Sequence, residues 1–212
     1  MKVVFFCIGI LILTLGISLT IQSDLGTSPF DALLVGLSVQ VGLSVGSWEI
    51  IIALFLLCCN SLILKRRPEV LGLLTAFITG IGIDMWLFML HSWATPELWL
   101  SKMAYMVIGL ILIGLGTATY LLTHFAPIPL DRLTLIIQEL TRTNLFAART
   151  FIYLIFLGLA LILKGPIGMG TILTVCLGGL ILNFFMSLIQ KILERFIHHA
   201  SPSTELMNDQ KQ

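Results

Sequence analysis

The sequence predicts an all-α membrane protein, a polytopic helix bundle of six spans built as two inverted three-span repeats. Composition is the first observation: 58% of the 212 residues are hydrophobic, 11% are charged, and the mean hydropathy is +1.04. Such a balance does not suit a water-soluble surface around a core of this size. The other two observations are an internal duplication and the placement of the basic residues. The sequence also predicts a short broken or re-entrant helix in each repeat.

The duplication relates positions 100 residues apart. The matching positions are Ile8-Gly9 with Ile108-Gly109, Leu15-Gly16 with Leu115-Gly116, Pro29-x-Asp31-x-Leu33 with Pro129-x-Asp131-x-Leu133, and Ile52-x-Leu54 with Ile152-x-Leu154. After a one-residue slip, Gly80 and Asp84 match Gly179 and Asn183. We therefore assign residues 1–100 to a first membrane repeat, 101–200 to a second, and 201–212 to a disordered cytoplasmic tail.

Six apolar stretches are long enough to cross about 30 Å of hydrocarbon as helices. They are Val3–Gln22, Trp48–Leu64, Val70–Leu90, Met103–Thr123, Thr150–Leu163 and Gly168–Leu188. The fifth is marginal unless its flanks are counted. The first resembles a secretory signal, but no small-x-small cleavage pattern follows it, and the same segment returns in the second repeat. We expect it to be retained as a span.

Basic residues orient the six spans, because cytoplasmic loops carry an excess of Lys and Arg. One side holds Lys2, Lys65, Arg66, Arg67, Arg132, Arg142, Arg149, Lys191, Arg195 and Lys211. The other side holds Lys102 and Lys164. This distribution places both termini in the cytoplasm. Three spans per repeat, an odd number, invert the second repeat relative to the first.

A short apolar helix is expected in each repeat, beginning at Pro29 in the first and Pro129 in the second. In the first, Ser28 is the expected N-cap, and proline suits the first helical position. This helix should end near Val41, which makes it too short to cross the membrane but apolar enough to enter it. The second helix has no capping serine and adds charged residues such as Arg132, so we expect it to lie shallower.

Paired, proline-interrupted apolar segments at matching positions in two repeats indicate the binding site of a transporter. The candidate substrate- or ion-binding residues are Pro29, Asp31, Asp84, Pro129, Asp131 and Asn183. Asp31 and Asp131 have two interpretations: each caps its own helix, or each takes part directly in binding a solute, proton or cation.

Asp84 falls within a span, where a carboxylate facing lipid costs about 2.5 to 3.5 kcal/mol, so it should face the protein interior. Ala76, Gly80 and Asp84 share one helix face, and the small residues allow close packing beside the carboxylate. Asp84 is either a proton or cation carrier, with Asn183 as its uncharged counterpart, or a hydrogen-bonding partner of a neighbouring helix.

Glu49 and Arg149 also correspond in the two repeats. An inverted arrangement places the starts of their helices at opposite faces of the membrane, so we expect about a membrane thickness between them. Each is then an interfacial anchor.

Other functional classes find little support in the sequence. The four cysteines and four histidines lack the spacing of a metal site or redox pair. The net charge of +1 comes with no basic aromatic patch for nucleic acid. A nucleophile and base with specific spacing are also missing. We therefore predict a non-enzymatic protein with no cofactor, no metal and no nucleic-acid partner.

The string Asp24-Leu-Gly-Thr-Ser-Pro-Phe-Asp31, followed by Gly36-Leu-Ser38 and Val41-Gly-Leu-Ser-Val-Gly-Ser-Trp48, resembles the YczE/YyaS/YitT family of bacterial membrane proteins. Arg67-Pro68 and the Gly80-x-Gly82-x-Asp84 helix are similar to the third span of that family. The likeness is good over residues 1–90 and fainter beyond. Phe30 replaces a common tryptophan. The resemblance implies an integral inner-membrane protein, and supplies neither a common activity nor catalytic residues.

The leading hypothesis is a small-solute secondary transporter or exporter, whose partners are the lipid bilayer and a small solute. The alternative is a non-transporting accessory or scaffold protein that binds another membrane protein, or a second copy of itself, through small-residue helix faces. The sequence does not identify the solute or the coupling ion.

Overall fold

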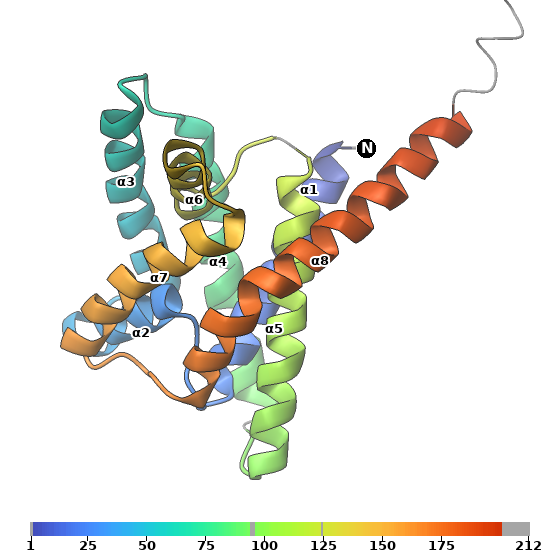
Figure 1. The fold of residues 1–212 in the computed structure, drawn as a ribbon. Helices are drawn as coiled ribbons and strands as arrows, with labels where there is room; N and C mark the ends of the chain where they lie inside the picture. Colours follow the sequence, from blue (N-terminus) through green and yellow to red (C-terminus); the bar gives the residue numbers. More distant parts are fainter. Residues whose placement is uncertain (1, 94–95, 124, 201–212) are drawn as a thin grey trace, which may run out of the picture.

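The protein is an all-helical bundle (Figure 1). The computed structural model describes residues 2–93, 96–123 and 125–200, and within these ranges the regular structure is entirely α-helical. The eight helices are α1 Lys2–Gln22, α2 Pro29–Val41, α3 Val45–Leu64, α4 Val70–Trp93, α5 Trp99–Leu121, α6 Pro129–Thr141, α7 Leu145–Ile162 and α8 Met169–Ala200. The tail predicted over 201–212 lies outside the described residues.

Six of these helices are long and apolar enough to cross a membrane, as the sequence predicts. They are α1, α3, α4, α5, α7 and α8, while α2 is a shorter apolar helix. The fifth span is less marginal than expected, because α7 begins at Leu145 rather than Thr150. The Asn144 side chain accepts a hydrogen bond from the backbone N–H of Ala147 at 2.7 Å and so caps the extra turn.

Helices α1 and α5 cross in close contact at the centre of the bundle. Gly9 lies against Gly116, and Gly16 lies against Gly109. A Cβ added at Gly116 would stand 2.4 Å from the backbone nitrogen of Leu13, so the two backbones meet without room for a side chain. Because the lower-numbered glycine of α1 faces the higher-numbered glycine of α5, the two helices run antiparallel.

The remaining helices pack in matched pairs around this crossing. Helix α4 lies against α1, and α8 lies against α5. Helix α2 packs along α7, while α6 packs along α3 (Figure 1). Helix α2 therefore rests mainly on a long helix of the other half of the chain, while α6 lies between α3 of the other half and α7 of its own.

The chain break before α2 is braced by the connection between α7 and α8. The backbone N–H of Gly170 donates to the Leu25 carbonyl at 2.8 Å, and the N–H of Thr27 donates to the Pro166 carbonyl at 3.3 Å. Gly26 has φ +95°, and a Cβ there would lie 2.4 Å from the backbone nitrogen of Gly168. Glycine is therefore required both by the backbone conformation and by the close approach.

The break before α6 is braced in the same way by α3 and α4. The hydroxyl of Thr75 donates to the Ala126 carbonyl at 2.9 Å. The Asn60 amide donates to the Pro129 carbonyl at 2.8 Å. A Cβ at Gly72 would stand 2.8 Å from the Pro127 carbonyl oxygen. These bonds satisfy backbone groups that an interrupted helix leaves open inside the bundle.

Substituting Gly116 with alanine should destabilise the protein, because the new methyl group meets the α1 backbone. Overpacking of this kind costs about 1 to 3 kcal/mol. Gly158→Ala is the matched control, since a Cβ there has nothing within 4 Å and gains up to about 1 kcal/mol of helix propensity. Thermal unfolding in detergent should show a lower transition temperature for Gly116→Ala only, and equal transitions would contradict the close crossing.

Candidate functional site

Four charged side chains from four different helices line one interior cavity. Asp31 comes from α2, Glu49 from α3, Asp131 from α6 and Arg149 from α7, and each lies within the first five residues of its helix. Helices α1, α4 and α5 complete the wall through Leu13, Ile17, Thr79, Ile113 and Thr117. Both halves of the chain thus contribute charge to the same space.

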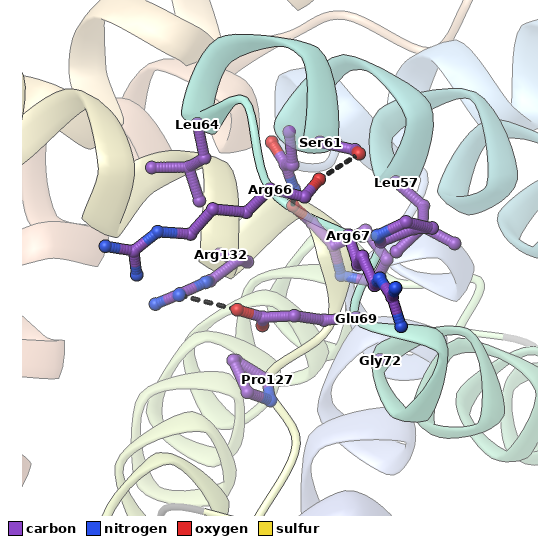
Figure 2. Close-up of a pocket in the computed structure, with 12 residues that line it drawn as sticks. Leu57, Ser61, Leu64, Arg66, Arg67, Glu69, Gly72, Pro127 and Arg132 are labelled. Atoms are coloured by element: carbon purple, nitrogen blue, oxygen red, sulfur yellow. Dashed lines mark hydrogen bonds and ion pairs between the residues drawn. The ribbon is translucent and has the colours of Figure 1, made fainter.

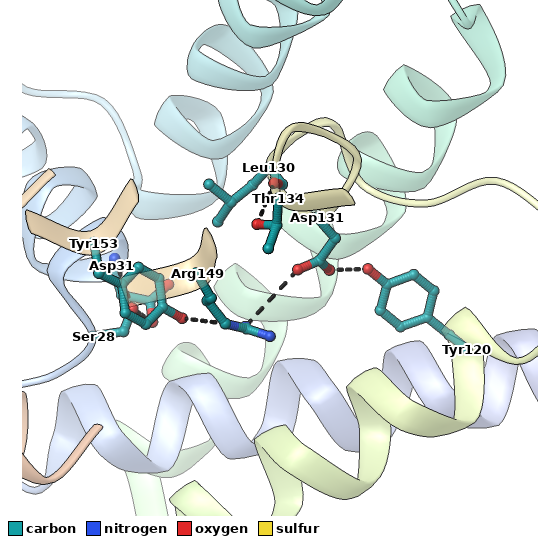
Figure 3. A network of polar contacts seen from close by, with 8 residues as sticks. All are labelled: Ser28, Asp31, Tyr120, Leu130, Asp131, Thr134, Arg149 and Tyr153. Carbon is teal, nitrogen blue, oxygen red and sulfur yellow. Dashed lines mark hydrogen bonds and ion pairs between the residues drawn. The ribbon is translucent and has the colours of Figure 1, made fainter. Parts of the chain in front are cut away.

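Asp131 has partners on two sides within the cavity. It lies between Tyr120 and Arg149 (Figure 3): the Tyr120 hydroxyl donates to one carboxylate oxygen, and the Arg149 guanidinium lies 3.8 Å from the other. The Arg149 Nε also donates to the Tyr153 hydroxyl at 3.1 Å, and its Cζ lies 5.4 Å from the centroid of that ring. Tyr120 and Arg149 therefore hold this carboxylate, and Tyr153 in turn holds the guanidinium.

Asp31 is 5% exposed and bonds within its own helix start. The Ser28 hydroxyl donates to the Asp31 carboxylate at 2.5 Å and accepts from the Asp31 backbone N–H at 3.1 Å, as an N-cap does. Asp31 lies outside the six candidate spans, and burial raises the pKa of its carboxyl to about 6, against weaker lowering effects of Ser28 and Arg149. Such a carboxyl exchanges protons near neutral pH.

Glu49 is 2% exposed and has no hydrogen-bond or ion-pair partner among the described residues. The Thr117 hydroxyl, on a residue 1% exposed, likewise lacks a partner within the described part of the chain. Both residues line the cavity. Buried polar groups normally find partners, so these two are the acceptors still open in the site.

The free space inside the cavity is small, about 40 Å³, which admits a few water molecules or a small ion. Over the described residues, no three His, Cys, Asp or Glu side chains are close enough together to hold one metal ion. The three carboxyl groups thus surround the space without meeting at a single point.

The expected separation of Glu49 from Arg149 is wrong, since both line this cavity. The expectation treated each repeat as a separate set of spans whose helices begin at the membrane boundary. Instead, α2 packs along α7 and α6 packs along α3, which brings the first turns of all four helices together. Arg149 is 12% exposed in its side chain, so it is a buried ion-pair partner rather than an interfacial anchor.

The structure brings together some of the predicted site residues and leaves others apart. Asp31 and Asp131 share the cavity, and Pro29 and Pro129 are buried at the starts of α2 and α6. The Pro129 carbonyl accepts the Asn60 bond described above. Binding at these positions stays a prediction.

Asp84 and Asn183 do not line the cavity. Asp84 accepts a hydrogen bond from the backbone N–H of Gly46 at 2.8 Å, where α3 and α4 approach closely. It therefore holds the first turn of α3 against α4, which matches the interpretation of a partner to a neighbouring helix. Asn183 is exposed on α8.

Sequence reasoning did not assign Glu49, Arg149, Tyr120, Tyr153 and Thr117 to the site. The available signal was the correspondence of Glu49 with Arg149 at the repeat spacing, each one turn into its helix. The tyrosines and Thr117 gave no signal, because isolated polar residues in apolar helices also serve ordinary packing.

A second pocket lies at the ends of the long helices, between the α3–α4 connection and the start of α6 (Figure 2). Arg66, Arg67 and Arg132 line it, and Arg132 pairs with Glu69 at 2.6 Å. This positively charged pocket is formed by residues that the sequence places on the basic, cytoplasmic side. Its charged residues are more exposed than those of the central cavity, and the two pockets share no charged residue.

Comparisons with known proteins agree with this membrane architecture. A family of unknown function, DUF6198, matches residues 1–187. An uncharacterized protein of Bacillus subtilis, YyaS, is 58% identical over 90% of this chain and 95% of its own length. A second B. subtilis protein, the uncharacterized membrane protein YczE, is 37% identical over 85% of this chain and 83% of its own. The chain belongs to the YczE/YyaS family.

Membership of the YczE/YyaS family extends over both halves of the chain, since the matched residues 1–187 include all four charged side chains of the cavity. An uncharacterized protein of Haemophilus influenzae is also similar, at 28% identity over 85% of this chain and 81% of its own. No solved structure matches the chain. The names of these relatives assign no activity, so function has to be argued from the cavity.

Replacing Arg149 with methionine should destabilise the fold, because Asp131 would keep a buried carboxylate without its cationic partner. Loss of one partner of a buried pair costs about 3 kcal/mol. The double variant Arg149→Met with Asp131→Asn should lose less than the sum of the two single changes. Thermal unfolding of all four proteins measures this, and strictly additive losses would show that the two residues do not interact.

Proposed function

We propose that this protein is a small-solute secondary transporter or exporter of the bacterial cytoplasmic (inner) membrane. The observation that carries the proposal is the central cavity, where Asp31, Glu49, Asp131 and Arg149 converge from both halves of a membrane bundle. Ionisable residues inside membrane proteins are expensive and mark solute, ion or proton pathways. We infer no enzymatic activity.

We also propose that the two halves are inverted repeats, each with a re-entrant short helix. The antiparallel crossing of α1 and α5, the first spans of the two halves, supports inversion, as do the matched neighbours of the other helices. Transporters with this symmetry place their sites at the interface of the repeats, among broken helices. Helices α2 and α6 begin beside the cavity and are too short to cross.

Alternating access in this arrangement follows from the contacts between the halves. Helices α2 and α7 would move as one unit and α3 and α4 as another, because each of these pairs is packed side by side. Rocking of one pair relative to the other opens the cavity first to one side of the membrane and then to the other. The carboxyl groups couple the cycle to protons, since three carboxyls beside one guanidinium cannot all stay ionised at low cost.

The coupling role assigned to Asp84 from sequence moves, in this proposal, to the cavity carboxyls. Asp31→Asn should abolish solute-dependent proton flux in proteoliposomes, because an amide does not accept the coupled proton. Glu139→Gln, at an exposed position of α6, is the matched control and should keep wild-type flux. Asp84→Asn should lower the amount of folded protein and leave the flux per folded molecule near wild type. Normal flux in folded Asp31→Asn would show that Asp31 takes no part in proton coupling.

The inverted topology predicts opposite labelling of two matched turns. Leu43, before α3, and Thr143, before α7, are exposed and 100 residues apart. In a background without the four native cysteines, Thr143→Cys should react with an impermeant thiol reagent from one side of the membrane and Leu43→Cys from the other. Labelling of both from the same side would contradict the inversion.

The accessory or scaffold alternative makes a different prediction for the same preparation. Folded wild-type protein that carries no tested solute across the liposome membrane, while it co-purifies with another membrane protein, would favour the scaffold.

A further inference from the structure

We propose that the central cavity binds a small organic cation, of the alkylammonium or guanidinium class, on Glu49 and exchanges it for a proton. The inference rests on the proposed function for the same cavity and names the chemical class of its solute. Two independent features support it: the charge imbalance of the cavity and the open acceptors on its wall.

The charge imbalance comes from three carboxyl groups facing one guanidinium. Asp31 on α2, Asp131 on α6, and Arg149 and Tyr153 on α7 are the titratable groups that line the cavity with Glu49, while α1, α4 and α5 contribute apolar side chains and threonines to its wall. With all carboxyls ionised, these groups carry two negative charges that no described side chain neutralises. Buried charge of this size is compensated by protons or by a bound cation.

The open acceptors are Glu49 and Thr117. Asp31 bonds to Ser28, while Asp131 bonds to Tyr120 and Arg149. Glu49, at 2% exposure, has no such partner among the described residues, and neither has the Thr117 hydroxyl. An ammonium or guanidinium group donates several hydrogen bonds at once and therefore suits a carboxylate with a hydroxyl on the same wall.

Arg149 shows that the cavity already accepts a planar organic cation. Its guanidinium bonds the Tyr153 hydroxyl, lies over the Tyr153 ring and pairs with Asp131. A cation on Glu49 would be the second positive charge in the same site. A metal ion fits less well, because the described carboxylates do not gather around one point.

The exchange conserves charge. Before binding, Glu49 holds a proton on one carboxyl oxygen. As the cation arrives, that O–H bond breaks, the proton leaves to water, and the carboxylate pairs with the cation. The net charge of the cavity is the same before and after, so neither state carries an added unpaired charge inside the membrane.

The test uses full-length protein in detergent micelles, in a weakly buffered solution, with guanidinium chloride at millimolar concentration as the probe. Urea is the matched neutral probe because it has nearly the same shape, and acetate is the anionic probe. We expect guanidinium to release about one proton per protein molecule, recorded with a pH electrode, and urea and acetate to release none. Proton release by methylammonium would extend the class to alkylammonium.

The variants locate the site. Glu49→Gln should abolish proton release and weaken guanidinium binding at least tenfold, because a charge-assisted bond is lost. Glu49→Asp, which keeps the carboxyl, should restore proton release in part. Glu139→Gln, an exposed carboxyl-to-amide change, should behave as wild type. Each variant is first checked for folding by gel filtration and thermal unfolding.

Three results would overturn the inference: guanidinium fails to bind folded wild-type protein, urea binds equally well, or folded Glu49→Gln still releases the proton. Solute flux, measured separately in proteoliposomes, distinguishes the two proposals. Flux of neutral or anionic solutes without cation binding would support the transport function and contradict the cation site. Cation binding without any flux would support the cation site and contradict the transport function.

Discussion

The arrangement of this bundle depends on the burial of charge at the starts of four helices. Asp31, Glu49, Asp131 and Arg149 would each be costly against lipid, and each is placed against protein or the central cavity instead. Asp131 and Arg149 offset each other, and the tyrosines beside them supply hydrogen bonds. Such burial requires α2, α3, α6 and α7 to begin near one another, which their cross-packing achieves.

That cross-packing in turn depends on backbone contact without side chains. The glycines of α1 and α5 allow the two central helices to touch. Gly26 allows the break before α2 to rest on the α7–α8 connection, and Gly72 allows the break before α6 to rest on α4. Hydrogen bonds from Thr75, Asn60 and the Gly170 backbone then satisfy carbonyl groups near the breaks. Small residues and a few polar side chains therefore hold helices together where the hydrophobic effect between helices is weak.

Much of the fold could be predicted because its signals are local. Helix length and apolar content predicted the six spans, and Ser28 with Pro29 predicted the start of α2. The site was predicted only in part. Asp31 and Asp131 belong to a local sequence motif, whereas Glu49 and Arg149 reach the cavity only because helices far apart in sequence pack together. Asp84 shows the reverse: its cost in a membrane is readable from sequence, but its partner, the Gly46 N–H, is not.

The two halves of the chain contribute differently to the cavity. Position 49 carries a carboxylate, whereas the matching position 149 carries a guanidinium. The guanidinium pairs with the aspartate of its own half, Asp131, while Glu49 has no partner among the described residues and Asp31 bonds within its own helix start. One half of the site is therefore internally neutralised and the other is left acidic. The difference between Glu49 and Arg149 thus makes the site asymmetric, and its acidic half is the part where we propose that a cation or a proton binds.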